Sequence, residues 1–321
     1  MSASNEGYVY HVYGAERYLH HVVASVHTLR RYDAVRPVAL YCPEDHIEIL
    51  RQHGLDQLFD QLHILPKEHW SIVGFKLHID QFKPYPQSLY VDADMIWCRN
   101  PDPLWQQLGA YTFTATGLER ADFYFGGPKG FGVLWEAIRD RRRATITRFG
   151  LTHLPRVQAG VIYAGDARAT ANVCHQARHF LKQAHLTHFR SRLAEGRSEE
   201  SCEWAMAMAM AHHEMPVLPW FQGYNSPQLD YIDGLVKHDD AFQTVVCTYW
   251  SDPSIRALRG LPDARWRDRL IRFFSKLPGK GDFLRVTPFT IHFGWAHQKA
   301  PYYAFAEHVW ATLISSSEQP E

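Results

Sequence analysis

The chain has 321 residues, 46% hydrophobic and 14% aromatic, which suffices for a sizeable globular core, and its 34 basic and 34 acidic residues leave no net charge to attract nucleic acid. Five scattered cysteines form no Cys-x-x-Cys pair, which argues against a disulfide framework or zinc site and favours a reducing cytoplasm. The N-terminus lacks a signal-peptide pattern, and no apolar run of about 18 residues predicts a membrane span.

The first two-thirds of the chain alternate β-rich runs with helical patterns, which predicts an α/β fold with a sheet wrapped by helices. Strands are expected at 8–13, 36–42, 61–66, 88–97, 111–117 and 157–165. Helices are expected at 16–32, 44–54, 75–82, 169–185 and 201–214, with a short one after NPDPLW. The less regular last third predicts strands at 215–220, 244–250 and 287–293 and a helix at 304–314.

A basic and aromatic segment at 256–285 includes ARWRDRLIRFFSKLPGKGD. The spacing predicts an amphipathic helix whose packed face carries Trp266, Leu270, Phe273 and Phe274, with the arginines in solvent. The alternative is a partner-binding element or a peripheral contact with a membrane surface.

Two carboxylates interrupt the apolar run SLYVDADMIW at 88–97, as expected for a buried strand whose end opens into a polar cleft. Asp92 and Asp94 are separated only by Ala93, so they repel each other unless a cation lies near them. Hard oxygen ligands suit Mg²⁺ or Mn²⁺. Alone, an Asp-x-Asp is more often a strand-end turn whose aspartates are solvated or cap a helix, so the surrounding residues decide.

Three further features add to this pattern. Lys76 comes shortly before the strand, where an ammonium can reach phosphates; the alternative is a solvated lysine. VQAGVIYAG carries small residues that allow close approach of a ligand or of another backbone. TIHFGWAHQKAPYY places His292 at the end of an apolar run and Lys299 soon after, so both can converge on a metal diphosphate.

In the order of these parts, over residues 8 to 303, the chain resembles the family 8 retaining glycosyltransferases. The resemblance implies one GT-A domain, a Rossmann-like α/β fold with a mixed central sheet flanked by helices. Its nucleotide-sugar-binding core would span about 8–230, and a C-terminal part over about 231–321 would return His292 to the active site. The resemblance also implies metal-dependent, retaining transfer of a hexose from UDP-glucose, UDP-galactose or UDP-GlcNAc to a glycan or other hydroxyl acceptor.

Matched position by position, the resemblance implies a role for each motif residue. Asp92 would bind the donor's ribose or the metal, and Asp94 and His292 would ligate Mn²⁺ or Mg²⁺. The remaining donor contacts would come from His11, Val12, Tyr13 and Gly14 around the base, from Ala93, and from Lys76 and Lys299 at the phosphates or sugar. The catalytic candidates are Gln158, which stands where the family has asparagine, and Glu203, with Glu200 as second choice. The closing motif departs from the family spacing, with Gly294 and Lys299 two and seven residues after His292.

Three other functions are compatible with parts of this pattern. A phosphohydrolase of the haloacid dehalogenase type also uses Asp-x-Asp, but its motif continues with Gly and Thr, whereas this chain reads DADMIW. A nucleotidyltransferase would need a glycine-rich phosphate loop near the start, which the sequence lacks. A nucleotide-sugar-binding protein without turnover is the non-enzymatic alternative. The acceptor stays open. Several aromatic residues are able to stack on sugars, although core packing is the commoner role for most residues of this kind: Trp220, Phe221, Tyr224, Trp250 and Trp295.

Overall fold

The computed structural model describes residues 5–120, 138–194, 196–250, 258, 261, 263–278 and 283–317, with the backbone alone at 249, 250 and 264. The chain divides into two compact units, between which it passes repeatedly. Unit 1 comprises Met1–Val22, Val35–Ala93 and Trp105–Trp220; unit 2 comprises Val23–Ala34, Asp94–Leu104 and Phe221–Glu321. Among the described residues, no helix has the length and apolar character that a bilayer span requires.

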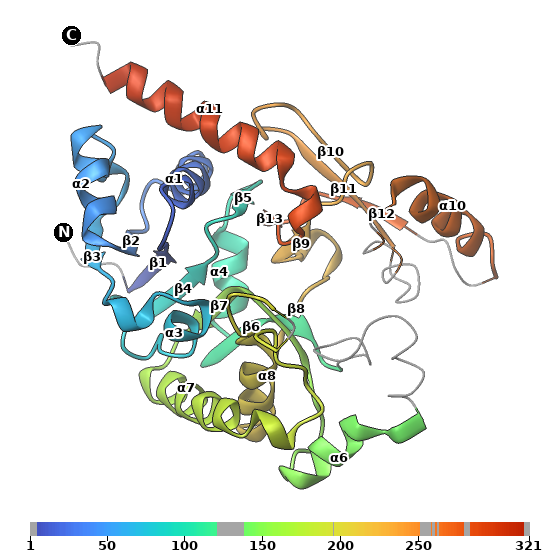
Figure 1. Cartoon of the computed structure of the whole chain (residues 1–321). Helices are drawn as coiled ribbons and strands as arrows, with labels where there is room; N and C mark the ends of the chain where they lie inside the picture. The colour runs from blue at the N-terminus through green and yellow to red at the C-terminus, as the bar shows by residue number, and fades with distance from the viewer. Residues whose placement is uncertain are drawn as a thin grey trace. The chain divides into compact units, whose positions relative to one another are not determined.

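A seven-stranded sheet in the order β3-β2-β1-β4-β7-β6-β8 forms the centre of unit 1 (Figure 1). The first four strands of this order run parallel to one another, while β7 is antiparallel to both β4 and β6, so the sheet is mixed. The strands are β1 (Glu6–His11), β2 (Val38–Cys42), β3 (Gln61–Ile64), β4 (Gln87–Val91), β6 (Phe113–Leu118), β7 (Arg156–Ala164) and β8 (Leu218–Pro219). Strand β2 is buried throughout, which explains its unbroken apolar sequence VALYC.

The strand order reverses between β1 and β4. From β1 the chain moves outward to β2 and β3 and then returns to the other side of β1 as β4. The register Val9 to Tyr90 places the carboxyl ends of these two strands side by side. In open α/β sheets, ligands bind outside the carboxyl ends of strands at such a reversal.

Helices pack on the sheet of unit 1. Helix α8 contacts both β7 and α7, as Figure 1 shows. Its sequence EWAMAMAMAH alternates like a strand, yet every residue from Trp204 to Ala211 is buried, because the helix is covered on all sides and alanine and methionine favour helices. Unit 1 contains α2 (Glu44–Gln52), α3 (Ile72–Lys76), α6 (Arg141–Arg148), α7 (Ala167–Lys182) and α8 (Glu203–His212), and shares α1 (Arg17–Arg30) and α4 (Asp102–Leu108) with unit 2.

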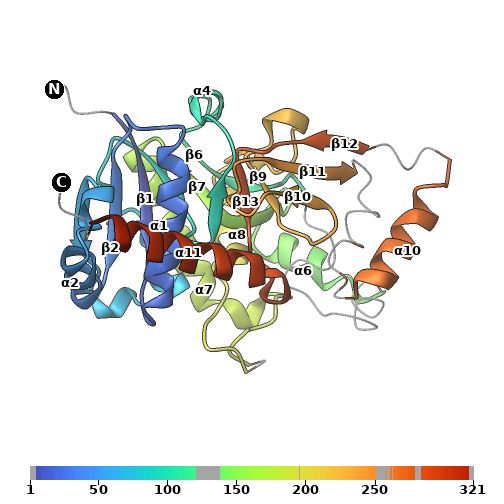
Figure 2. The same cartoon turned by 90° about the horizontal axis from the view of Figure 1, so that it is seen from above.

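Unit 2 contains two three-stranded sheets. In one, β11 (Val245–Trp250) lies between β10 (Val236–His238) and β12 (Phe283–Val286), as Figure 2 shows. In the other, β13 (Thr290–His292) is antiparallel to β5 (Met95–Trp97) and parallel to β9 (Gln228–Asp230). The unit's helices are α10 (Ala264–Phe274) and α11 (Ala300–Ser317).

Most predicted elements are confirmed within a few residues, but several predictions are wrong. The predicted strand at 88–97 is two strands in different sheets, because the chain turns at residues 92–94. The predicted helix at 75–82 is the short α3, which Ser71 caps by accepting a hydrogen bond from the Gly74 amide. Strand β1 stops at His11, β8 has only two residues, and β9, β10 and β12 were not predicted.

The expected packed face of the amphipathic helix is confirmed for Phe274, which packs against the small core around Ile271, but it is wrong for two other aromatic residues. In α10, Trp266 and Phe273 are 60% and 63% exposed, whereas Arg267 and Ile271 are buried. The rest of the 256–285 segment lies partly outside the described residues.

Candidate functional site

The carboxyl end of β4 carries a buried ion pair. Asp92 directly follows β4, and Lys76 is the last residue of α3. The Lys76 Nζ lies 2.6 Å from Asp92 Oδ1 and donates to the Ala159 carbonyl oxygen on β7 at 2.8 Å. Burial alone would lower the pKa of Lys76, but the Asp92 carboxylate raises it above its ordinary value. Lys76 is therefore a charged, buried partner of Asp92, and the solvated-lysine interpretation is wrong.

Residues 11–14 form the end of β1 and the turn after it. The His11 ring stacks on Phe75 of α3 with centroids 4.0 Å apart and planes within 9°. Val12 is buried, Tyr13 is half-buried, and Gly14 adopts a φ of 85°, which favours glycine. The turn thus lies beside α3, at the strand reversal where Asp92 also lies.

Glu199, which the sequence analysis missed, ties this region together. Its carboxylate accepts hydrogen bonds from the Tyr13 hydroxyl at 2.7 Å and from the Ile72 amide at 2.7 Å. Burial and the Glu199 carboxylate raise the pKa of Tyr13, so its hydroxyl stays a neutral donor. Glu199 therefore holds both the β1 turn and the first residue of the helix that carries Lys76.

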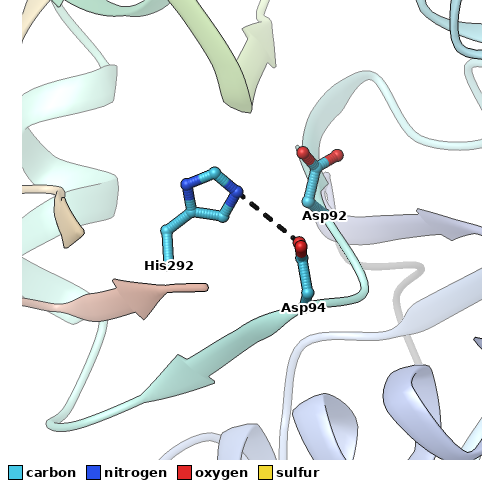
Figure 3. A group of neighbouring side chains, drawn as sticks. All are labelled: Asp92, Asp94 and His292. Carbon is cyan, nitrogen blue, oxygen red and sulfur yellow. Dashed lines mark ion pairs between the residues drawn. The ribbon is translucent and has the colours of Figure 1, made fainter. Parts of the chain in front are cut away.

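A second cluster lies in unit 2, where β5, β9 and β13 are neighbours. Figure 3 shows the His292 imidazole directed at Asp94, with Nε2 3.5 Å from Asp94 Oδ1. On its other side, His292 Nδ1 lies 3.1 Å from Asp230 Oδ1 at the end of β9. Lys299 Nζ donates to Asp94 Oδ2 at 2.7 Å, and the Trp295 indole donates to Asp230 Oδ2 at 3.4 Å.

Burial and ion pairing shift the pKa values of this cluster in opposite directions, and ion pairing has the larger effect. Burial would raise the pKa of Asp94, but His292 and Lys299 hold it well below its ordinary value. Burial would lower the pKa of His292, but Asp94 and Asp230 raise it to about 10. Asp230 was not among the predicted site residues, and no local motif around QLD marks it.

The side chains suit a hard divalent cation. Asp92, Asp94 and His292, all labelled in Figure 3, can each offer one carboxylate oxygen or imidazole nitrogen as a ligand. Each aspartate already has a lysine against it, Lys76 at Asp92 and Lys299 at Asp94. The two carboxylates match Mn²⁺ and Mg²⁺ better than soft metals, whereas the imidazole is a ligand that borderline ions such as Zn²⁺ and Fe²⁺ also accept.

The catalytic candidates also lie in unit 1, near Lys76. Gln158 directly precedes Ala159, whose carbonyl accepts from Lys76, and the Glu203 carboxylate adds to the raised pKa of Lys76. Gln158 is half-buried on β7, and its backbone carbonyl accepts from the Thr116 hydroxyl. Glu203 opens α8, with its side chain 31% exposed and 3.8 Å from Arg192. Glu200 instead accepts from the Ser191 hydroxyl at 2.7 Å and the Arg192 amide at 3.0 Å, so it secures its own loop.

The aromatic candidates for acceptor stacking differ in environment. Tyr224 is 63% exposed and Trp295 is 38% exposed. Trp220 packs under the Arg156 guanidinium, 5.2 Å from the ring centroid, and Phe221 is half-buried. The side chain of Trp250 lies outside the described residues.

No protein-family model matches the chain, and no curated protein sequence does. Solved structures do match. The galactosyltransferase LgtC in complex with donor and acceptor sugar analogues is 12% identical, with a TM-score of 0.50 over 98% of this chain and 97% of that one. An active-site variant of LgtC gives a TM-score of 0.51 at the same identity and coverage. The glycosyltransferase GlyE of Streptococcus pneumoniae, 12% identical, gives 0.50 over 97% of this chain and 63% of that one.

These likenesses establish the fold. The chain has the GT-A fold, with a mixed central sheet flanked by helices, as the resemblance implied.

Proposed function

We propose that this protein is a glycosyltransferase that moves a hexose from a UDP-sugar to a hydroxyl acceptor. The observation that carries the proposal is the strand reversal of unit 1, where the turn after β1 and the Asp-x-Asp after β4 meet on a GT-A fold. Residues 11–14 would bind the nucleotide base and Ala93 and Asp92 the ribose side. UDP-glucose, UDP-galactose and UDP-GlcNAc are the candidate donors, and a glycan is the candidate acceptor.

A divalent metal, Mn²⁺ or Mg²⁺, would be held by Asp92, Asp94 and His292. Because consecutive Cα atoms are about 3.8 Å apart, the backbones of the two aspartates stay within about 7 Å of each other in any arrangement of the units. Asp94 and His292 already point at each other within unit 2. Bound there, the metal would neutralise charge on the diphosphate.

The chain's own cations would share that task. Negative charge grows on the departing diphosphate in the transition state, and Lys76 and Lys299 would each stabilise it once they turn from their aspartates to the phosphates. Gln158 and Glu203 would line the reacting sugar or the acceptor, and transfer would proceed with retention. Loss of one such contact lowers the rate about a hundredfold, or about 3 kcal/mol.

We further propose that the two units act as one catalytic domain and that the enzyme works in the cytoplasm. The free, buried state of all five cysteines supports a reducing compartment.

The test is a calorimetric titration with a panel of nucleotide sugars, each run with manganese and again with chelator. We expect metal-dependent binding of a UDP-sugar and slow donor hydrolysis, both lost in Asp94→Ala. Asp240→Ala removes an exposed carboxylate of unit 2 and serves as the matched control. Binding to no nucleotide sugar, or hydrolysis by Asp94→Ala at the wild-type rate, contradicts the proposal. Binding without any turnover would instead identify a nucleotide-sugar-binding protein.

A further inference from the structure

Helix α10 of unit 2 turns a stripe of mixed aromatic and basic residues outward. Its exposed side chains recur every three or four positions, so they lie on one side of the helix and of the turn that follows. Trp266, Phe273 and Leu277 are 60%, 63% and 38% exposed. We call the following set the α10 stripe: Arg265, Trp266, Arg269, Arg272, Phe273, Lys276 and Leu277.

The opposite side of α10 fixes this orientation. Ile271 packs with Ile232 and Leu235 in a small core of unit 2. Arg267 is 1% exposed, and its Nη2 donates to the Asp233 carbonyl oxygen at 2.6 Å. Rotating the helix to bury Trp266 and Phe273 would break these contacts and expose that core. The outward aromatics are therefore a built feature of the unit.

The α10 stripe is strongly cationic. Among the ion pairs of the described residues, none involves Arg265, Arg269, Arg272 or Lys276, and the Arg269 guanidinium lies 5.7 Å from the Trp266 ring centroid. The acidic residues of the helix are used elsewhere: Asp263 caps Trp266 and Asp268 pairs with Arg267. Four cations thus interleave with three apolar side chains that water solvates poorly.

We propose that the α10 stripe docks on an anionic lipid bilayer. The aromatic rings would enter the interfacial layer, while the arginines and the lysine extend to lipid phosphates. A helix lying in the plane of the interface satisfies both kinds of side chain along one stripe. A second copy of the same stripe is a poor occupant, because it would bring four cations against four.

The test is flotation of the full chain with vesicles of phosphatidylcholine mixed with phosphatidylglycerol, against pure phosphatidylcholine. We expect binding to the anionic vesicles that weakens as salt is raised. Arg269→Gln/Arg272→Gln should bind about 30-fold more weakly, since each basic residue near an anionic surface contributes about fivefold. Trp266→Ser/Phe273→Ser should lose at least about tenfold from the lost apolar insertion.

The matched control is Arg168→Gln/Lys182→Gln, which removes the same charge from exposed positions of α7 in unit 1 and should bind like wild type. Absence of wild-type binding to anionic vesicles overturns the proposal, as does an equal loss in the control. Light scattering without lipid tests whether a second copy of the chain binds the stripe instead. If the protein self-associates, Trp266→Ser/Phe273→Ser abolishes this, and vesicles do not bind, the stripe is a protein interface. The stripe and its test are independent of glycosyl transfer.

Discussion

The ion pair between Lys76 and Asp92 joins a buried cation to a more accessible anion. Removing one partner should therefore cost a different free energy from removing the other. The Lys76 side chain is 10% exposed and the Asp92 side chain 21% exposed. In Asp92→Asn, the ammonium stays buried without a paired carboxylate, and it keeps neutral acceptors such as the new amide oxygen and the Ala159 carbonyl. In Lys76→Met, the carboxylate that is left can be reached by water.

We therefore expect unequal losses in the free energy of unfolding. Removing one partner of a buried pair costs about 3–5 kcal/mol, and Asp92→Asn should fall near the lower end because Ala159 still accepts from Lys76. Lys76→Met should lose only about 1 kcal/mol, since methionine fills a similar volume and Asp92 can hydrate. The double variant buries no charge and should recover about 2 kcal/mol relative to Asp92→Asn.

The assay is urea unfolding of the full chain, followed by tryptophan fluorescence with chelator present so that no metal contributes. Asp240→Asn changes an exposed aspartate and should stay within about 0.5 kcal/mol of wild type. The reasoning is refuted if Lys76→Met loses as much as Asp92→Asn, or if the double variant loses the sum of the two.

Three other outcomes are expected. Glu199→Gln should lower the free energy of unfolding in urea by about 1–2 kcal/mol. The glutamine side chain has one acceptor oxygen where the carboxylate has two, so it cannot serve both Tyr13 and Ile72 equally well; an unchanged urea midpoint would contradict this. Burial raises the pKa of Glu200, but hydrogen bonds from the Ser191 hydroxyl and backbone amides leave it below its ordinary value. The contribution of Glu200 to the stability of the fold is thus present above the ordinary glutamate pKa and is lost as the pH falls through the depressed pKa. The free energy of unfolding of Glu200→Gln should therefore fall less steeply with acidification than that of wild type. Burial raises the pKa of Cys202 to about 12, and all five cysteines are buried, so Ellman's reagent at mildly alkaline pH should label none in the native protein and all after denaturation. A native thiol that reacts promptly would show that its burial is wrong.

Local sequence patterns were sufficient to predict strands and site residues where both depend on residues close together in the chain. The apolar run into Asp92 and Asp94 predicted the strand β4, and the apolar run that ends at His292 predicted β13, each without reference to the rest of the chain. The alternation of β-rich and helical segments predicted the α/β class. The break between β4 and β5 was missed because apolar residues continue on both sides of the two aspartates.

Long-range partners could not be predicted in this way. Glu199 lies 186 residues from Tyr13, and Asp230 lies 62 residues from His292, and neither stands in a motif that points to its partner. Helix α10 failed for a different reason. Its sequence offers two candidate inner faces. The face around Ile271 packs on Ile232 and Leu235, which lie far away in sequence, and Arg267 donates from it to the Asp233 carbonyl.

The interleaved course of the chain has a consequence for synthesis on the ribosome. Strand β5 is fully buried in the finished protein, but its neighbour β13 is made nearly two hundred residues later. At about 5–20 residues per second, the apolar sequence Met95, Ile96, Trp97 waits about 10–40 s for that partner. The nascent chain therefore carries an unpaired apolar strand while the residues between β5 and β13 are made, and we expect a larger chaperone supply during expression to raise the yield of folded protein.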